Sequence, residues 1–423
     1  MAKQVLIATI GSFGDLHPYL AIAIGLKQRG HSVTLASCGM FREKVESEGI
    51  RFVAIPPALD NVELDAEIRR KAMNTFDGTR YVVQELFLPP IEEAYRILLA
   101  EARGADVLLG SLFALALPMV AVKLGIPYIN TALQPAAILS AYDPPLIPIM
   151  PFLSWLSPSI LKRVYGGLHT LNGSLLKKAY DLAKQEGLPA TSVPKLFGHS
   201  SPHGNLVLFS KHFMREQPDF PKPTTMCGFP FYDKLDGRQF TVDPEIESFF
   251  AAGEAPYVFT LGTSAVLDPG SFYNEAYTAV TRMRKRAIFL VGRANYPEYK
   301  KLENDRLLVC QYAPHSTLMP RAAVTIHQGG IGTTAQALRA GKPMIVVPFS
   351  HDQPDNARRC VKLGVGLSIP RKRFNAALLQ EALEAAPKLN ELARSMGILI
   401  QSEDAVVAAC EKIEATHPSP RTT

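Results

Sequence analysis

The sequence predicts an α/β protein made of two doubly wound, Rossmann-like halves. Short apolar runs rich in β-branched residues lack period-two alternation, which is typical of parallel strands covered on both faces. Helical patterns lie between these runs, as in β-α-β units with right-handed crossovers. The same alternation occurs twice, before and after the stiff proline-rich segment Gln217–Pro223.

The first half contains five predicted strands and a first helix over about Pro18–Arg29, which Gly30 ends. A long helical region precedes about Arg103. The predicted strands are Gln4–Ile10, Ser32–Ser37, Phe52–Ile55, Ala105–Leu109 and Pro127–Ala132.

The second half repeats this pattern with five more predicted strands. We expect an N-terminal domain over residues 1–215, a linker over 216–245 and a C-terminal domain over 246–400, with a cleft at the carboxyl ends of both sheets. The predicted strands are Tyr257–Leu261, Ala287–Val291, Leu307–Gln311, Ala323–His327 and Pro343–Val347.

The composition excludes several classes of protein. The formal net charge of +6 is spread along the chain without interleaved aromatic residues, so no nucleic-acid partner is expected. Five scattered cysteines without a C-x-x-C pair argue against disulfides and zinc, and favour a reducing cytoplasm. Glycine, serine or proline interrupts the apolar stretches Val107–Val122 and Pro144–Leu161, so neither is expected to span a membrane.

The segment His327–Thr333 has the residues of an anion-binding turn. It follows a predicted strand, and its three glycines allow close approach of backbone to a ligand before a helix starts near Thr333. The free N–H groups and positive dipole at that helix start suit a diphosphate. A purely structural turn is the alternative, and the spacing fits neither a P-loop nor a dinucleotide fingerprint.

The flanking segments Tyr312–His315 and Pro348–Asn356 give the turn a recognisable context. Together the three segments resemble the donor-binding signature of the family 1 glycosyltransferases, which have the GT-B fold. The resemblance implies that a base and ribose, a diphosphate and a sugar bind here. The implied contacts are Tyr312, Ala313 and His315 for base and ribose, Thr263, Ser264, His327, Gly330, Gly332 and Thr333 for phosphate, and Asp352 and Gln353 for sugar. Plant members have Glu at the position of Ala335, so Gln336 is the substitute considered for the ribose.

The segment Gly11–Pro18 resembles the bacterial N-terminal motif G-S-x-G-D-x-x-P of the same family. The resemblance implies that Asp15 deprotonates the acceptor hydroxyl. The structural alternative for Asp15 is a helix N-cap, and His17 is the rival base. A base is needed because the acceptor oxygen attacks the anomeric carbon while the nucleotide leaves from the opposite face.

The acceptor pocket is expected in the first half. Phe13 and the proline-rich stretch Pro144–Leu161, with Met150, Phe152 and Trp155, supply apolar side chains that suit a flavonoid, polyketide or lipid. The stretch is equally compatible with domain core or a lid. It is also compatible with peripheral membrane contact, with Lys162 and Arg163 at its rim.

Strings such as Thr260–Thr263 and His327–Gly332 are similar to bacterial rhamnosyltransferases of the rhamnolipid-synthesising and flavonoid-glycosylating type. The resemblance implies an inverting O-glycosyltransferase that uses dTDP-rhamnose or UDP-glucose, and a C-terminal helix within 401–423 that crosses back to the first domain. The absence of a D-x-D motif argues against a bound metal, and no cofactor or obligate protein partner is expected. A nucleotide-sugar epimerase and a non-catalytic nucleotide-sugar binding protein are the alternatives.

Overall fold

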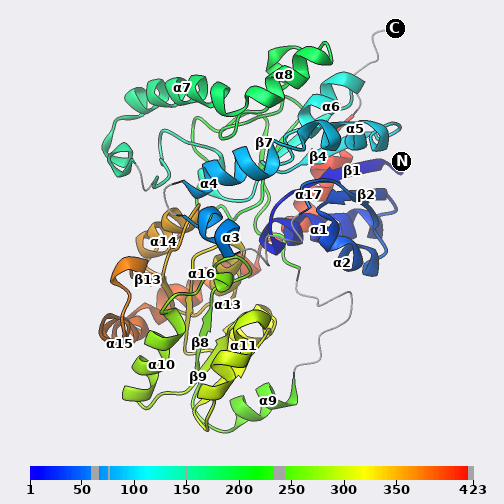
Figure 1. The fold of residues 1–423 in the computed structure, drawn as a ribbon. Coiled ribbons are helices and arrows are strands. Elements are labelled where there is room, and N and C mark those ends of the chain that lie inside the picture. Colours follow the sequence, from blue (N-terminus) through cyan, green and yellow to red (C-terminus); the bar gives the residue numbers. More distant parts are fainter. Residues whose placement is uncertain (59–65, 75–76, 148–149, 233–242, 418–423) are drawn as a thin grey trace. The chain divides into compact units, whose positions relative to one another are not determined.

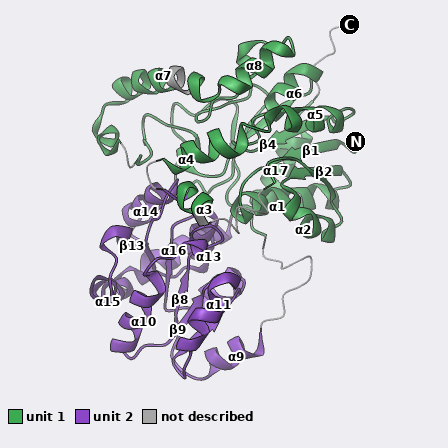
Figure 2. Ribbon diagram, in the orientation of Figure 1, with its two compact units in different colours: residues 1–72, 76–232, 403–423 green, residues 73–75, 233–402 purple. Residues whose placement is uncertain are grey.

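The computed structural model describes residues 1–58, 66–74, 77–147, 150–232 and 243–417. The chain divides into two compact units (Figure 2). Unit 1 comprises residues 1–72, 76–232 and 403–423, and unit 2 comprises residues 73–75 and 233–402. The part of the expected linker over 233–242 lies outside the described residues.

Unit 1 is built on a parallel sheet whose described strands follow the order β3-β2-β1-β4-β5-β6-β7 (Figure 1). The order reverses between β1 and β4, so the crossover connections leave in opposite directions there. The strands are β1 (Gln4–Ala8), β2 (Ser32–Ser37), β3 (Arg51–Ala54), β4 (Val107–Gly110), β5 (Tyr128–Ala132), β6 (Asn205–Val207) and β7 (Thr224–Met226). Strands β6 and β7 were not predicted.

The helices of unit 1 match the predicted alternation, with two differences. In its described residues, the long helical region before Arg103 has three helices and a π-helical segment, Val82–Phe87, and the first helix begins at Phe13 instead of Pro18. The helices are α1 (Phe13–Gln28), α2 (Arg42–Ser47), α3 (Ala66–Ala72), α4 (Gly78–Tyr81), α5 (Ile91–Glu101), α6 (Leu117–Leu124), α7 (Pro158–Leu175), α8 (Lys177–Gln185) and α17 (Ala405–Glu414).

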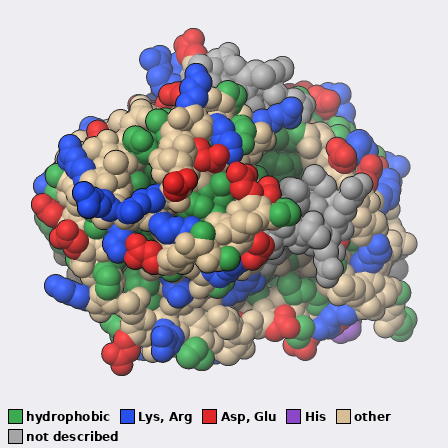
Figure 3. Space-filling model, turned by 90° about the horizontal axis from the view of Figure 1, so that it is seen from below, with side chains coloured by type: hydrophobic (Ala, Val, Ile, Leu, Met, Phe, Trp, Pro, Cys, Tyr) green, Lys and Arg blue, Asp and Glu red, His purple; other side chains and the backbone are tan. Residues whose placement is uncertain are grey.

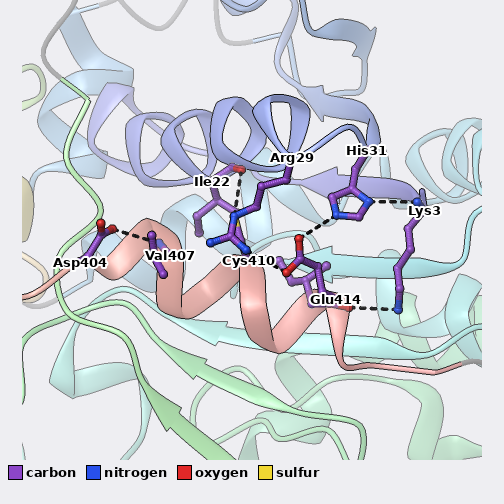
Figure 4. A network of polar contacts seen from close by, with 9 residues as sticks. Lys3, Ile22, Arg29, His31, Asp404, Val407, Cys410 and Glu414 are labelled. Atoms are coloured by element: carbon purple, nitrogen blue, oxygen red, sulfur yellow. Dashed lines mark hydrogen bonds and ion pairs between the residues drawn. The ribbon is translucent and has the colours of Figure 1, made fainter. Parts of the chain in front are cut away.

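The helix α17 returns from the end of the chain and packs against α1 (Figure 4). Glu414 accepts hydrogen bonds from Arg29 and pairs with His31, both at 2.9 Å. Lys3 donates to the backbone carbonyls of Ile413 and Thr416. These contacts fasten the last described helix to the start of the chain.

Unit 2 has a second parallel sheet, whose described strands follow the order β10-β9-β8-β11-β12-β13. This order reverses between β8 and β11. The strands are β8 (Tyr257–Thr260), β9 (Ala287–Leu290), β10 (Leu307–Cys310), β11 (Val324–His327), β12 (Met344–Val346) and β13 (Gly366–Ser368). The helices are α9 (Pro244–Ala251), α10 (Phe272–Arg282), α11 (Gly292–Tyr299), α12 (His315–Leu318), α13 (Ile331–Ala340), α14 (Gln353–Lys362), α15 (Ala376–Ala385) and α16 (Asn390–Gln401).

Each unit has its own apolar core around its sheet. A smaller cluster in unit 1 contains Leu153, Leu161 and Tyr165 and joins the segment after β5 to α7. On the face drawn in Figure 3, basic and acidic side chains are interspersed. Among the described residues, no helix combines the length and apolarity that crossing a bilayer requires.

Candidate active site

Three loops of unit 2 meet at the carboxyl edge of its sheet. Thr260, the last residue of β8, is in register with His327, the last residue of β11. His327 is in turn in register with Val346, the last residue of β12. The loops that follow these strands therefore adjoin at the reversal of strand order, which is where open α/β sheets bind ligands.

The loop after β11 leads into an uncapped helix start. Gly330 is the N-cap residue of α13, and no described side chain caps it. The Thr334 N–H donates to the Gly330 carbonyl at 2.9 Å, so the amides of residues 331–333 precede the first intrahelical bond. Gly329 has φ +89°, and a Cβ there would approach the Gln353 carbonyl oxygen to 3.2 Å. Glycine is therefore required at 329, and three amides of α13 remain for an anion.

His327 lies fully buried at the base of this loop. Its Nδ1 accepts a hydrogen bond from the Gly329 N–H at 3.1 Å, which assigns the ring proton to Nε2. That Nε2 is buried and has no hydrogen-bond partner among the described residues. Burial, with a smaller contribution from His315, lowers the His327 pKa to about 3. His327 is thus a neutral donor with one N–H to offer.

The first turn of α14 is hydrogen-bonded to the same loop. Gln353 is buried, and its Oε1 accepts from the Phe349 and Ser350 N–H groups at 2.8 and 3.1 Å. Asn356 Nδ2 donates to the Gly329 carbonyl at 2.9 Å and to Asp352 Oδ2 at 2.6 Å. The predicted sugar contacts Asp352 and Gln353 therefore adjoin the glycine loop. Asn356 was not predicted as a site residue, although it is the last residue of the segment Pro348–Asn356.

The predicted base and ribose contacts lie after β10 and on α12. Tyr312 is 48% exposed, as a stacking platform requires, whereas the Ala313 side chain is in the core. His315 Nε2 is 3.5 Å from Thr260 Oγ1, which joins α12 to the end of β8. Gln336 Oε1 accepts from Arg339 at 2.9 Å.

The remaining phosphate candidates lie on two elements. Thr263 is exposed and Ser264 half-buried, where the loop after β8 enters the short helix Ala265–Leu267. Gly332 and Thr333 lie in the first turn of α13, and the Ala335 side chain is buried. Unit 2 thus brings its predicted phosphate contacts to one sheet edge.

The acceptor motif in unit 1 folds differently from the expected loop. Helix α1 starts at Phe13 because Ser12 caps it: the Gly14 N–H donates to Ser12 Oγ at 3.2 Å. Asp15 is the third helical residue, and Ser12 N–H and Oγ–H donate to its Oδ2 at 2.8 and 3.1 Å. This is a capping box, so Asp15 is not the N-cap itself. Pro18 lies inside the helix and has no N–H to donate to the Gly14 carbonyl, so α1 lacks that intrahelical bond.

The Asp15 carboxylate lies after β1, next to the reversal of strand order in unit 1. Gly11 has φ +143°, and a Cβ there would overlap the Asp15 carboxylate. Burial raises the pKa of Asp15, and the hydrogen bonds from Ser12 oppose that rise. A desolvated carboxylate held by fixed donors is suited to accept a proton.

The rival base His17 is part of an aromatic cluster. Its ring lies 5.6 Å from Phe13 and 5.2 Å from Tyr232, and the Lys44 ammonium lies over both of these rings. These contacts describe a packed side chain.

The expected acceptor residues belong to separate clusters. Phe13 packs against the main core of unit 1, whereas Met150 packs against the small cluster of Leu153, Leu161 and Tyr165. Phe152 and Trp155 are 50% and 84% exposed. Residues 148–149 of the same stretch lie outside the described residues.

Comparisons with known domain families agree with this arrangement. The Glycosyltransferase family 28 N-terminal domain matches residues 5–141, and the Erythromycin biosynthesis protein CIII-like C-terminal domain matches residues 279–397. The chain is a nucleotide-sugar-dependent glycosyltransferase. Its predicted enzyme class is therefore confirmed.

Two relatives of this chain are themselves named as glycosyltransferases. The O-mycaminosyltylonolide 6-deoxyallosyltransferase of Streptomyces fradiae is 29% identical, with 97% of each chain covered. A sterol 3-beta-glucosyltransferase of Penicillium rubens is 27% identical over 97% of this chain, which spans 30% of that longer protein.

Solved structures show the same fold. The glycotransferase of kitacinnamycin superposes with a TM-score of 0.74 at 21% identity, covering 99% of this chain and all of the other. The spinosyn rhamnosyltransferase SpnG, complexed with thymidine diphosphate, gives 0.66 at 18% identity, with 97% and 100% covered. The predicted GT-B fold is confirmed.

Proposed function

We propose that this glycosyltransferase is an inverting, metal-independent O-glycosyltransferase that acts on a hydroxyl of a hydrophobic acceptor, with Asp15 as the base. The observation that carries the proposal is the Asp15 carboxylate, held through Oδ2 by two donors of Ser12. Because both bonds fall on Oδ2, Oδ1 is left as the oxygen that takes the proton.

The reaction is a single displacement. The acceptor oxygen forms a bond to the anomeric carbon, and the bond from that carbon to the diphosphate oxygen breaks on the opposite face. The hydroxyl proton goes to Asp15, and the nucleoside diphosphate leaves as an anion. The amides of α13 and the His327 Nε2–H would stabilise its charge without a metal ion.

The proposed donors are dTDP-rhamnose and UDP-glucose. The name of SpnG, a spinosyn rhamnosyltransferase complexed with thymidine diphosphate, favours the first, and the name of the sterol 3-beta-glucosyltransferase favours glucose as the sugar. The exposed Tyr312 ring would stack on either pyrimidine base.

The proposed acceptor is a flavonoid or other polyphenol, or a hydroxylated lipid. Exposed Phe152, Trp155 and Ile160 provide an apolar surface on unit 1. A phenol is the less demanding acceptor, since its pKa of about 10 lies below that of an aliphatic alcohol. The exposed Lys162 and Arg163 follow this surface, which suits contact with an anionic bilayer as a second use.

A screen tests the function. Each donor is incubated with phenolic and lipid acceptors, glycosylated products are detected by mass spectrometry, and binding to anionic vesicles is followed by sedimentation. We expect nucleoside diphosphate release that depends on acceptor. Acceptor-free interconversion of UDP-sugars by NMR would instead support an epimerase, and donor binding without turnover would support a sensor.

Asp15→Ala tests the base. We expect acceptor-dependent turnover to fall at least about a hundredfold, the contribution typical of general base catalysis. Asp181→Ala, which removes an exposed carboxylate of α8, is the matched control and should retain activity. Normal turnover in Asp15→Ala would exclude Asp15 as the base.

A further inference from the structure

One buried polar side chain of the segment His327–Thr333 is not among the implied phosphate contacts. Gln328 follows His327 directly, and only 5% of its surface is exposed. Its Nε2 is 3.4 Å from Thr333 Oγ1, and its Oε1 has no hydrogen-bond partner among the described residues. Because a buried carbonyl oxygen is seldom left unpaired, this amide requires an explanation.

The amide of Gln328 lies where the loops after β8 and β11 meet. A Cβ added to Gly262 would overlap Gln328 Nε2, and one added to Gly330 would approach it to 2.8 Å. Gly262 also has φ +62°. Glycines at both positions therefore leave room for the amide, which contacts the two loops and the first turn of α13.

The preceding residue carries a second buried polar atom without a partner among the described residues, His327 Nε2. The uncapped amides of α13 begin only three residues after Gln328. Two unpaired side-chain groups and a helix start thus gather on one short segment, as a ligand with several acceptor oxygens would require.

The oxygen and nitrogen of a glutamine amide exchange places when the amide turns by 180°. In the turned orientation, Gln328 Oε1 accepts from the Thr333 hydroxyl and the Nε2–H group takes the unpaired position. We propose that Gln328 binds the donor diphosphate directly, its Nε2–H donating to a phosphate oxygen beside the His327 Nε2–H. This inference rests on the proposed diphosphate site, but not on Asp15 or on any acceptor.

Two substitutions separate ligand binding from packing. Gln328→Leu introduces an apolar side chain of similar size that has no hydrogen-bond donor. Gln328→Glu keeps the shape and an acceptor for the Thr333 hydroxyl, but sets a carboxylate against the diphosphate. If Gln328 only packs the loops, the Leu variant should bind nucleotide as tightly as the wild type. If Gln328 contacts the diphosphate, the Leu variant should bind less well than the wild type, and the Glu variant, which adds repulsion, less well again.

Calorimetric titration with dTDP and UDP, without acceptor, measures the difference. We expect Gln328→Leu to bind about tenfold more weakly than the wild type, as for one lost hydrogen bond to an anion, and Gln328→Glu at least tenfold more weakly again. Gln401→Glu, on the exposed surface of unit 2, is the charge control and should change affinity less than about twofold.

Nucleotide binding by Gln328→Leu as tight as that of the wild type would overturn the role of Gln328 alone. A wild type that binds neither dTDP nor UDP would overturn the diphosphate site as well. Melting curves without ligand establish whether each variant folds. If Gln328→Leu does not fold, Gln328→Met replaces it, because the flexible methionine side chain adapts to irregular space.

Discussion

Unit 1 and unit 2 each contain a strand, a glycine turn and a helix start at the reversal of strand order, but the two helix starts differ. In unit 1, the side chains of Ser12 and Asp15 form a capping box at the start of α1. In unit 2, α13 starts at the N-cap Gly330 with no described side chain as a cap. At the start of α1 the Asp15 side chain supplies the anion. At the start of α13 the backbone amides remain for the anion of a bound molecule.

This difference gives the two junctions different chemistry. A carboxylate placed at the N-terminus of α1 is stabilised by the helix dipole and by Ser12, and it is available as a base. The uncapped amides of α13, beside a neutral His327, are suited to hold a leaving diphosphate. One local architecture thus serves proton transfer or anion binding, depending on the residues at the N-cap and third helical positions.

The largest effect on nucleotide binding is expected from an acidic side chain placed at the N-cap of α13. Gly330→Asp places a carboxylate at the N-cap, where it occupies the amides and repels a diphosphate. Like charges about 4 Å apart at an effective dielectric constant near 20 interact by about 4 kcal/mol, so we expect nucleotide binding to weaken by at least about a hundredfold. Calorimetry with dTDP and UDP measures the change.

Gly330→Ala is the matched control for Gly330→Asp. Both substitutions set a Cβ about 2.8 Å from Gln328 Nε2, so both carry the same steric cost, but only one adds a charge. A loss of affinity as large in the alanine variant as in the aspartate variant would show that space, and not an occupied helix start, controls binding.

A smaller effect is expected at His327. His327→Leu removes a buried N–H that faces an anion, which should weaken binding of a nucleotide-sugar by about tenfold to a hundredfold. Because the folded-state pKa of about 3 keeps His327 neutral, wild-type affinity should show no His327 titration between pH 5.5 and 8. Nucleotide affinity is measured across that pH range. An affinity that rises on acidification would indicate that His327 becomes protonated.

The same depressed pKa affects stability. The neutral form is favoured in the folded protein, so the stability His327 contributes is complete above its ordinary pKa of about 6.5 and is lost as the pH falls towards 3. His327→Gln should therefore lose less of its melting temperature than the wild type between pH 7 and pH 4.5.

Sequence patterns predicted the sheets better than they predicted the helix starts. The five strands expected in unit 2 are present to within a residue at either end, because buried β-branched runs depend on local composition. β6, β7 and β13 are short and were missed. The start of α1 was misplaced by five residues, because Pro18 was taken as its first turn although the Ser12–Asp15 capping box lies upstream.

The candidate site divides in the same way. The glycine turn is recognisable from the sequence pattern, and the roles of His327 and Asp15 were implied by the family resemblance. Gln328 and Asn356 are recognisable from neither, because their importance lies in contacts with Gly262 and Gly329, which are distant in sequence. No local pattern indicates that a glutamine amide lies between two glycines.

The smallest effect is expected from a substitution that weakens the capping box of α1. Ser12→Ala removes the acceptor of the Gly14 N–H and one donor to Asp15, which should lower the free energy of unfolding by about 1 kcal/mol. Because the Ser12 hydroxyl opposes the raised pKa of Asp15, loss of this one hydrogen bond should raise that pKa further. The limb of the pH–rate profile that reports the base should then move to higher pH. Ser12→Thr keeps the hydroxyl and should retain the wild-type profile. A Ser12→Ala variant that lost stability without any shift of the profile would confine Ser12 to capping α1 and would separate the capping box from the base.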